Sequence, residues 1–141
     1  MLKVKIISIG KNKEKWLIEA INEYEKRLSS AIQFEWIFLK NNLSLSDYTE
    51  KMPFIALDPM GKEFESISFS KQIFKMFEEN HSRLNFVIGS SDGIPKEILK
   101  KSFFKISLSK LTFTHQITRL ILIEQIYRAY QIQHGSKSYQ K

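Results

Sequence analysis

Short apolar runs that read as β-strands alternate with amphipathic stretches along almost the whole chain, and this alternation limits the possible folds most strongly. The strand-like runs are residues 3–9, 32–38, 54–57, 85–88 and 104–108. Between them, residues 13–28 and 69–77 carry apolar side chains at helical spacing. Strands separated by helices predict an α/β fold with a largely parallel sheet flanked by helices.

The remaining segments read as connections and one long C-terminal helix. Residues 40–52 are polar and suit a loop or a short helix, and residues 58–61 suit a turn because they hold Pro and Gly. Pro95 suits the first turn of a helix, and residues 112–114 lead into the C-terminal helix. No repeat or linker divides the sequence, so we expect a single domain covering residues 1–141.

Composition excludes several classes of chemistry. The chain has no cysteine, which removes disulfides, thiolate metal sites and cysteine nucleophiles. His81, His115 and His134 are dispersed, so we expect no metal site. The sequence lacks GxxxxGK[ST], GxGxxG and G-x-S-x-G motifs, which argues against nucleotide-phosphate sites, dinucleotide sites and serine hydrolysis.

The apolar runs are too short for a membrane protein. The longest aliphatic run is residues 120–123, far below a membrane span. Met1 leads directly into the first predicted strand and leaves no room for the apolar core of a signal peptide. We therefore expect a cytoplasmic protein without membrane contact.

Positive charge is concentrated in the last third of the chain. Residues 1–94 contain 13 basic and 13 acidic side chains, whereas residues 95–141 contain 9 basic and 2 acidic ones and so carry the whole net charge of +7. Such a local excess fits a binding surface for a polyanion such as nucleic acid. It equally fits a solvated basic surface.

Three loops follow the carboxyl ends of predicted strands, where parallel sheets bind ligands. They span residues 57–62, 89–94 and 108–115 and are rich in small and hydroxyl residues. Gly89 and Gly93 allow either close approach of a ligand to the backbone or a positive φ. The same residues also fit two ordinary turns at strand ends.

The motifs in these loops resemble the RlmH family of SPOUT methyltransferases in content, order and spacing. The matching segments are Leu57-Asp58-Pro59-Met60-Gly61-Lys62, Phe86-Val87-Ile88-Gly89, Asp92-Gly93, Ser107-Leu108-Ser109, Leu111-Thr112, His115, Arg119 and Glu124-Gln125-Ile126-Tyr127-Arg128-Ala129. Near the start, Ile9-Gly10-Lys11, Glu23-Tyr24 and Lys26-Arg27 match as well. The resemblance covers the whole chain, although residues 40–52 form a shorter segment than is usual in the family.

The resemblance implies an α/β fold whose C-terminal part is threaded as a trefoil knot. It implies S-adenosylmethionine as methyl donor and a homodimer whose two protomers build each active site. The implied reaction is methylation of N3 of a pseudouridine in 23S ribosomal RNA, on a stem-loop of the large subunit that faces the small subunit. A domain this small is expected to recognise its target on assembled ribosomes.

Positions carried over from the resemblance define the expected site. The donor-binding residues are Leu57, Gly89, Ser90, Ser109, Lys110, Leu111, Thr112, Phe113 and Thr114. The sulfonium of the donor already makes its methyl group electrophilic, so the protein has to position the reactants and help the attacking nitrogen. Arg119, His115 and Tyr139 are the candidates for that help. Alternatively, Arg119 forms a salt bridge and His115 caps the long helix.

Two positions depart from the family pattern. Ser90 stands where the family usually has a second glycine, and serine fits there only with a negative φ or modest strain. The tail reads Tyr139-Gln140-Lys141, whereas the family commonly has Tyr-His followed by a basic residue. Glutamine cannot take a proton near neutral pH. These departures keep a non-catalytic RNA-binding module open as an alternative, beside a transfer RNA methyltransferase.

Overall fold

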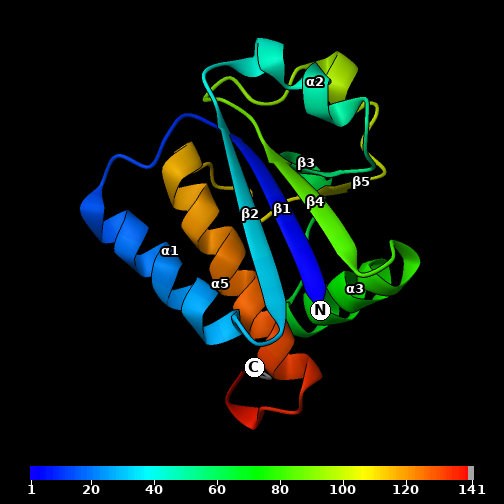
Figure 1. The fold of residues 1–141 in the computed structure, drawn as a ribbon. Coiled ribbons are helices and arrows are strands. Elements are labelled where there is room, and N and C mark those ends of the chain that lie inside the picture. Colours follow the sequence, from blue (N-terminus) through cyan, green and yellow to red (C-terminus); the bar gives the residue numbers. More distant parts are fainter. Residues whose placement is uncertain (140–141) are drawn as a thin grey trace.

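A five-stranded sheet forms the centre of the computed structural model, which describes residues 1–139 (Figure 1). Its strands are β1 (Leu2–Ile9), β2 (Ile32–Leu39), β3 (Ile55–Lys62), β4 (Arg83–Ile88) and β5 (Phe104–Ile106). They lie in the order β2-β1-β4-β3-β5, and every neighbouring pair is parallel. The predicted α/β fold with a parallel sheet is confirmed.

Helices cover both faces of this sheet (Figure 1). They are α1 (Lys15–Leu28), α2 (Ser46–Thr49), α3 (Ser66–Glu79), α4 (Lys96–Leu99) and α5 (His115–Gln133), with short 3-10 turns η1 (Asn42–Ser44) and η2 (Lys137–Tyr139). The apolar side chains of α3 and α5 share one core cluster with the sheet, and α1 joins α5 beside it. Residues from the α2 and α4 regions form a second cluster on the other face.

The central strand β1 shows why both faces have to be covered. Val4 and Ile6 point into the α3/α5 cluster, whereas Ile7 and Ile9 point into the cluster on the α2/α4 side. All four side chains are buried. A strand of a parallel sheet that is buried on both faces reads as a nearly continuous apolar run, and the second half of β1, residues 6–9, does so apart from Ser8.

Several strand bounds differ from the sequence-based expectation, among them the carboxyl ends of β3 and β5. Residues 58–61, expected as a turn, belong to β3, whose pairing with β5 shifts so that both Leu57 and Lys62 lie opposite Ile106. The strand therefore bulges where Pro59 interrupts regular pairing. The fifth strand was expected to reach Leu108 but ends at Ile106. The backbone N–H of Ser107 still bonds to the Lys62 carbonyl at 2.9 Å, and the Ser107 hydroxyl donates to the Ser109 carbonyl at 3.0 Å within the loop that follows.

The long helix α5 has no single apolar face. Leu122, Ile126 and Ala129 pack into the main core, and Ile123 packs against α1. The hydroxyl of Ser70 on α3 donates a buried 2.7 Å bond to the Ala129 carbonyl. Because α5 contacts the sheet and both neighbouring helices, its apolar residues are distributed around its circumference.

Candidate functional site

A cavity of about 610 Å³ opens where the carboxyl ends of β3, β4 and β5 meet the start of α5. Its walls come from the three loops that the sequence singled out, around residues 57–59, 88–93 and 108–115. Its volume lies within the range of small-molecule sites, roughly 300–1,000 Å³. The parallel sheet explains the gathering of these loops, because it brings the carboxyl ends of its strands to one edge.

The turn after β4 is shaped by its two glycines, each for a different reason. A Cβ atom on Gly89 would lie 2.6 Å from the carbonyl carbon of Gly93, so the turn closes tightly on itself. Gly93 has a φ of +85°, with no atom within 4 Å of its Cβ position. Ser90 is not among the residues with positive φ, so serine fits without backbone strain.

The loop between β5 and α5 is ordered by short-range hydrogen bonds. The Ser109 hydroxyl accepts from the backbone N–H of Leu111 at 3.0 Å. Thr114 caps α5, since its hydroxyl accepts from the N–H of Ile117 at 3.2 Å. The alternative in which His115 caps this helix is therefore wrong, because His115 is the first helical residue.

Most of the predicted donor-binding residues lie in the cavity wall. Leu57, Gly89, Ser90, Ser109, Leu111, Thr112, Phe113 and Thr114 all line it. Lys110 does not, because its side chain is exposed and forms an ion pair with Glu63 at 3.7 Å. Their role in donor binding stays a prediction.

Several lining residues were not among the predicted donor-binding residues. They are Asp58, Pro59, Ile88, Ser91, Gly93, Leu108 and Thr118. Five of these fall within the three candidate loops, so the sequence did indicate the loops that contain them, although it did not predict them individually as donor-binding residues. Thr118 lies outside them, but it is one helical turn after His115 and therefore faces the same way.

His115 is the cavity-lining member of the three catalytic candidates. Its ring packs on the β1–α1 connection, where a Cβ atom on Gly10 would lie 2.8 Å from its Nε2. Burial, followed by the charges of Arg119 and Lys13, lowers the pKa of His115 below its usual value of 6.5. The imidazole is therefore neutral near pH 7 and able to accept a proton.

Arg119 lies behind the cavity rather than in its wall. Its guanidinium donates to Ser8 Oγ at 2.8 Å, to Asn12 Oδ1 at 2.6 Å, and to the carbonyls of Ile9 and Gly10. No carboxylate of residues 1–139 is among these partners, so the salt-bridge interpretation is wrong. Burial lowers the pKa of Arg119 to about 10, which leaves the side chain charged at neutral pH. The geometry indicates that Arg119 holds the end of β1 in place.

Tyr139 lies near the other end of α5. Its ring meets that of Tyr127 edge-on at 5.8 Å, and Arg128 Cζ lies 5.2 Å from its centroid. Tyr127 is twelve residues after His115, which corresponds to about 18 Å along a helix. The expectation that the tail lies beside the donor loops is therefore wrong for residues 135–139 and the chain's own cavity. Gln140 lies outside the described residues.

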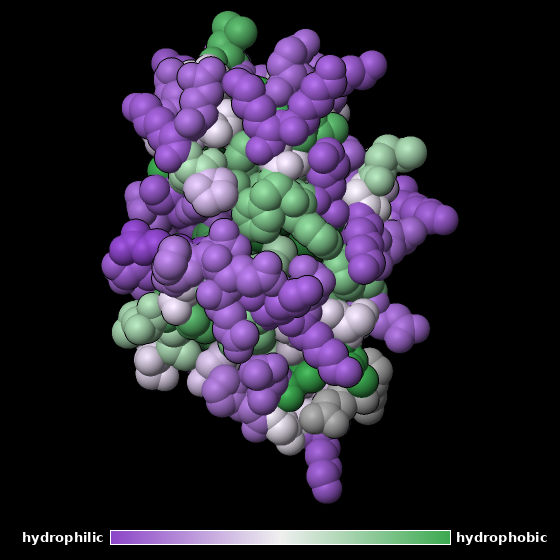
Figure 2. All heavy atoms as spheres, turned by 90° about the vertical axis from the view of Figure 1, so that its right-hand side faces the viewer, coloured by the Kyte–Doolittle hydropathy of each residue, from purple (hydrophilic) through white to green (hydrophobic). Residues whose placement is uncertain are grey.

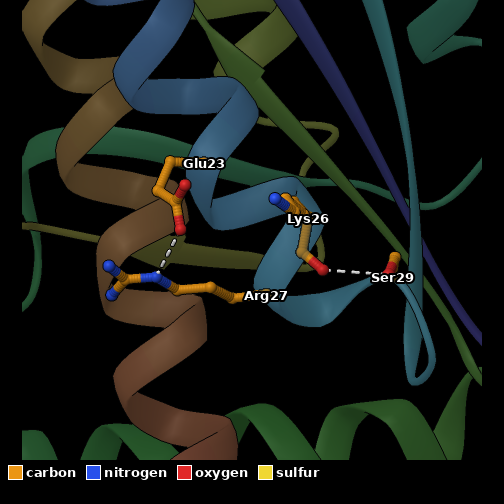
Figure 3. A network of polar contacts seen from close by, with 4 residues as sticks. All are labelled: Glu23, Lys26, Arg27 and Ser29. Atoms are coloured by element: carbon orange, nitrogen blue, oxygen red, sulfur yellow. Dashed lines mark hydrogen bonds and ion pairs between the residues drawn. The ribbon is translucent and has the colours of Figure 1, made fainter.

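A basic and aromatic cluster surrounds Tyr139 at that end of the molecule. Arg27 extends from α1 toward α5 and donates a 2.9 Å bond from its Nε to Glu23 (Figure 3). Arg27 Cζ also lies 5.5 Å from the Tyr127 ring centroid. The hydrogen bond to Glu23 raises the pKa of Arg27, and a bond to Glu124 raises that of Arg128. Two permanent cations thus flank half-buried aromatic rings.

Neither a metal cluster nor a membrane-spanning helix is found in the described part of the chain. Within residues 1–139, no three His, Asp or Glu side chains are grouped to hold a metal ion. None of the helices in the same residues is long and apolar enough to cross a membrane.

Fold, cavity and sequence agree with one class of enzyme. Residues 2–139 match the family model described as a predicted SPOUT methyltransferase. Two solved structures share the fold: a Legionella pneumophila methyltransferase in complex with S-adenosylmethionine (TM-score 0.52, 9% identity) and the SpoU methyltransferase of Streptomyces viridochromogenes in complex with the same cofactor (TM-score 0.52, 8% identity). They cover 92% and 94% of this chain, which spans 66% and 58% of theirs. The class is therefore that of SPOUT methyltransferases.

Sequence relatives narrow this class. The ribosomal RNA large subunit methyltransferase H of Protochlamydia amoebophila is 51% identical over 138 residues, covering 97% of this chain and 98% of that protein. The enzymes of the same name from Clostridium tetani and Streptococcus uberis are each 39% identical. Their alignments cover 95% and 96% of this chain, and 97% and 98% of theirs. The chain belongs to the family of ribosomal RNA large subunit methyltransferase H, the RlmH family.

Proposed function

We propose that this protein transfers a methyl group from S-adenosylmethionine to N3 of a pseudouridine in 23S ribosomal RNA, on assembled ribosomes in the cytoplasm. The observation that carries the proposal is the cavity of about 610 Å³ at the carboxyl edge of the sheet, in a chain of this family. Its relatives are named for large-subunit ribosomal RNA. The basic excess of residues 95–141 supports a nucleic-acid substrate.

The cavity suits a ligand with an apolar body and a few polar edges. Leu57, Ile88, Leu108 and Phe113 supply apolar surface, and the loops between them supply backbone N–H and C=O groups. The open space beside Gly93 lets a ligand approach the turn closely. When bound, S-adenosylmethionine would supply an electrophilic methyl group there, held by the loops around residues 57, 89–93 and 109–114.

His115 is the cavity residue best suited to receive the N3 proton. It lines the same cavity as the donor loops, and its lowered pKa keeps it neutral near pH 7. Arg119 serves this step indirectly, since it secures the carbonyls of Ile9 and Gly10 beneath the His115 ring. We therefore assign Arg119 a positioning role in place of direct contact with the base.

In a homodimer, a partner subunit could supply the Tyr139 side chain that is absent from the single chain's cavity. Tyr139 and the basic cluster around Tyr127 lie about 18 Å along α5 from the protomer's own cavity. A partner packed against α5 could bring its own tail to that cavity. Apolar residues also form a patch ringed by hydrophilic ones on the face shown in Figure 2, which is the side of α2, α3 and β5 and not that of α5, so this patch is a separate candidate contact surface. The knotted threading of the C-terminal segment belongs to the same proposal and rests on family membership.

Methyl transfer to ribosomes, isolated subunits and naked ribosomal RNA, measured side by side, tests the proposed substrate. We expect transfer to intact ribosomes and little to naked RNA. Mass spectrometry of RNA from cells lacking this protein should show one missing methyl group on a 23S pseudouridine. Loss of a methyl group from transfer RNA instead would overturn the substrate. Calorimetry that detects no donor binding would favour a non-catalytic RNA-binding module.

Sedimentation tests the dimer. We expect a dimer at micromolar concentration, and mixing His115→Gln protomers with Tyr139→Ala protomers should restore part of the activity that each variant lacks. A monomer with full activity would contradict the shared site.

A further inference from the structure

The turn after β4 is held from outside the cavity by Asn42. The side-chain amide of Asn42 donates to Ser90 Oγ at 3.0 Å and to the Gly93 carbonyl at 3.1 Å. Its Oδ1 accepts from the backbone N–H of Ser90 at 3.4 Å. One side chain thus bonds to both ends of the turn, although Asn42 itself is not part of the cavity wall.

Asn42 is attached to a firm support. It begins the short turn η1, which Asn41 caps by accepting from the N–H of Leu43 at 3.0 Å. Three residues later, Leu45 is fully buried in the same cluster as Val87 of β4 and Ile98 of α4. The segment that carries Asn42 is therefore fixed to the core that also underlies the turn.

Ser90 provides the matching partner within the turn. Its hydroxyl accepts from Asn42 and, at 3.4 Å, from the backbone N–H of Asp92. Its carbonyl accepts from the N–H of Gly93 at 2.8 Å, and the two residues form an antiparallel bridge. A glycine at position 90 would lack the hydroxyl that links Asn42 to the interior of the turn.

We propose that Asn42 is a positioning residue that holds turn 89–93 in its ligand-binding shape, and that Ser90 is its partner. The role deepens the proposed function, on which it rests, by naming a determinant of donor affinity outside the cavity wall. Side-chain bonds that tie a loop to a rigid element reduce the number of loop conformations that binding has to order. Removing them lowers the population of the binding shape and so weakens apparent affinity.

The experiment uses the full-length protein and two readouts. Amide hydrogen exchange of the 90–93 backbone is measured without ligand, and the Kd of S-adenosylmethionine is measured by calorimetry. Asn42→Ala should speed exchange in the turn and raise the Kd by roughly tenfold. Asn42→Asp should resemble Asn42→Ala, because it loses both amide donors. Ser90→Ala should reduce the effect of Asn42→Ala when the two are combined, since they share a bond.

Asn85→Ala is the matched control. Asn85 also ties a distant loop to the sheet, by donating 2.9 Å to the Pro53 carbonyl, but it does not touch the turn. Its loss should leave turn exchange and donor affinity unchanged. The proposal would be overturned if Asn42→Ala left amide exchange in the turn unchanged. It would also be overturned if folded Asn42→Ala exchanged faster in the turn but bound S-adenosylmethionine with unaltered affinity. If the unaltered protein binds no donor, the proposed function fails, and the exchange data alone then decide whether Asn42 orders the turn.

Discussion

Arg119 Nε donates a 2.8 Å hydrogen bond to the hydroxyl of Ser8, and both side chains are fully buried. The bond joins the first turns of α5 to the end of β1. A buried cation is costly unless its donors are satisfied, and here two side-chain oxygens and two carbonyls satisfy them. The Phe38 ring, 4.8 Å from Arg119 Cζ, covers the cation further.

Arg119→Met should lower the free energy of unfolding by about 3 kcal/mol, because it leaves buried oxygens without donors. Arg119→Lys should recover only part of this loss, since an ammonium group cannot reproduce the guanidinium geometry. Urea denaturation measures both. Arg83→Met, at an exposed arginine, should change stability by less than about 0.5 kcal/mol. Similar losses at both positions would contradict the role of Arg119.

His115 should make stability depend on pH below neutrality. Its folded pKa lies below the unfolded value of 6.5, mainly because of burial. The stability that the neutral ring contributes is present above the unfolded pKa and is lost as the pH falls through the folded pKa. The unaltered protein should therefore lose more stability than His115→Gln between about pH 7.5 and about pH 5.5. Parallel pH curves for the two proteins would show that His115 is not responsible.

Gly89→Val should weaken donor binding far more than folding. The sequence suggested that Gly89 is needed for close approach of a ligand or for a positive φ, but the structure gives another reason. A Cβ at position 89 would lie 2.6 Å from the carbonyl carbon of Gly93 and would therefore displace the turn. Gly89→Ala should already raise the Kd of S-adenosylmethionine at least roughly tenfold. Gly135→Ala is the control, because Gly135 lies outside the cavity wall and has no neighbour within 4 Å of its Cβ position. Unlike Gly89 it has a positive φ, so any strain from alanine there falls on the tail and not on the cavity. Equal donor affinity in folded Gly89→Val would refute the expectation.

Donor binding should need no added metal. The cavity is lined by small, hydroxyl and apolar residues, and the described residues hold no cluster of metal ligands. Calorimetry before and after EDTA treatment should give the same Kd. Activity that is lost on chelation and restored by a divalent ion would count against a metal-free site.

Deleting residues 135–141 should leave the fold and donor binding nearly intact while removing most methyl transfer. The tail is polar, and Tyr139 contacts the outer end of α5 through Tyr127 and Arg128. Tyr139→Ala alone should reproduce much of the loss, because a partly accessible aromatic ring beside cations suits stacking on an RNA base. Gln140→His should be neutral or faster. If the truncated protein methylates ribosomes at the full rate, the tail has no role in methyl transfer and the prediction is wrong.

Local patterns in the sequence determined the elements and the three loops. The spacing of apolar residues distinguishes the strands from the amphipathic helices. Parallel strands then have to collect their following loops at one edge, which is why eight predicted donor residues meet in one cavity. These inferences need only short-range spacing and the geometry of a parallel sheet.

The positions of single side chains were decided only by the tertiary structure. Sequence spacing could not show that Arg119 turns toward Ser8 and Asn12, more than a hundred residues away. It also placed Tyr139 beside the donor loops, whereas the length of α5 carries it to the opposite end. Asn42, in a segment that the sequence left unresolved, bonds to Ser90 in the turn, and Leu45 of the same segment is buried in the core. Such contacts depend on how helices and strands pack against each other, and the spacing of residues within one segment does not determine that packing.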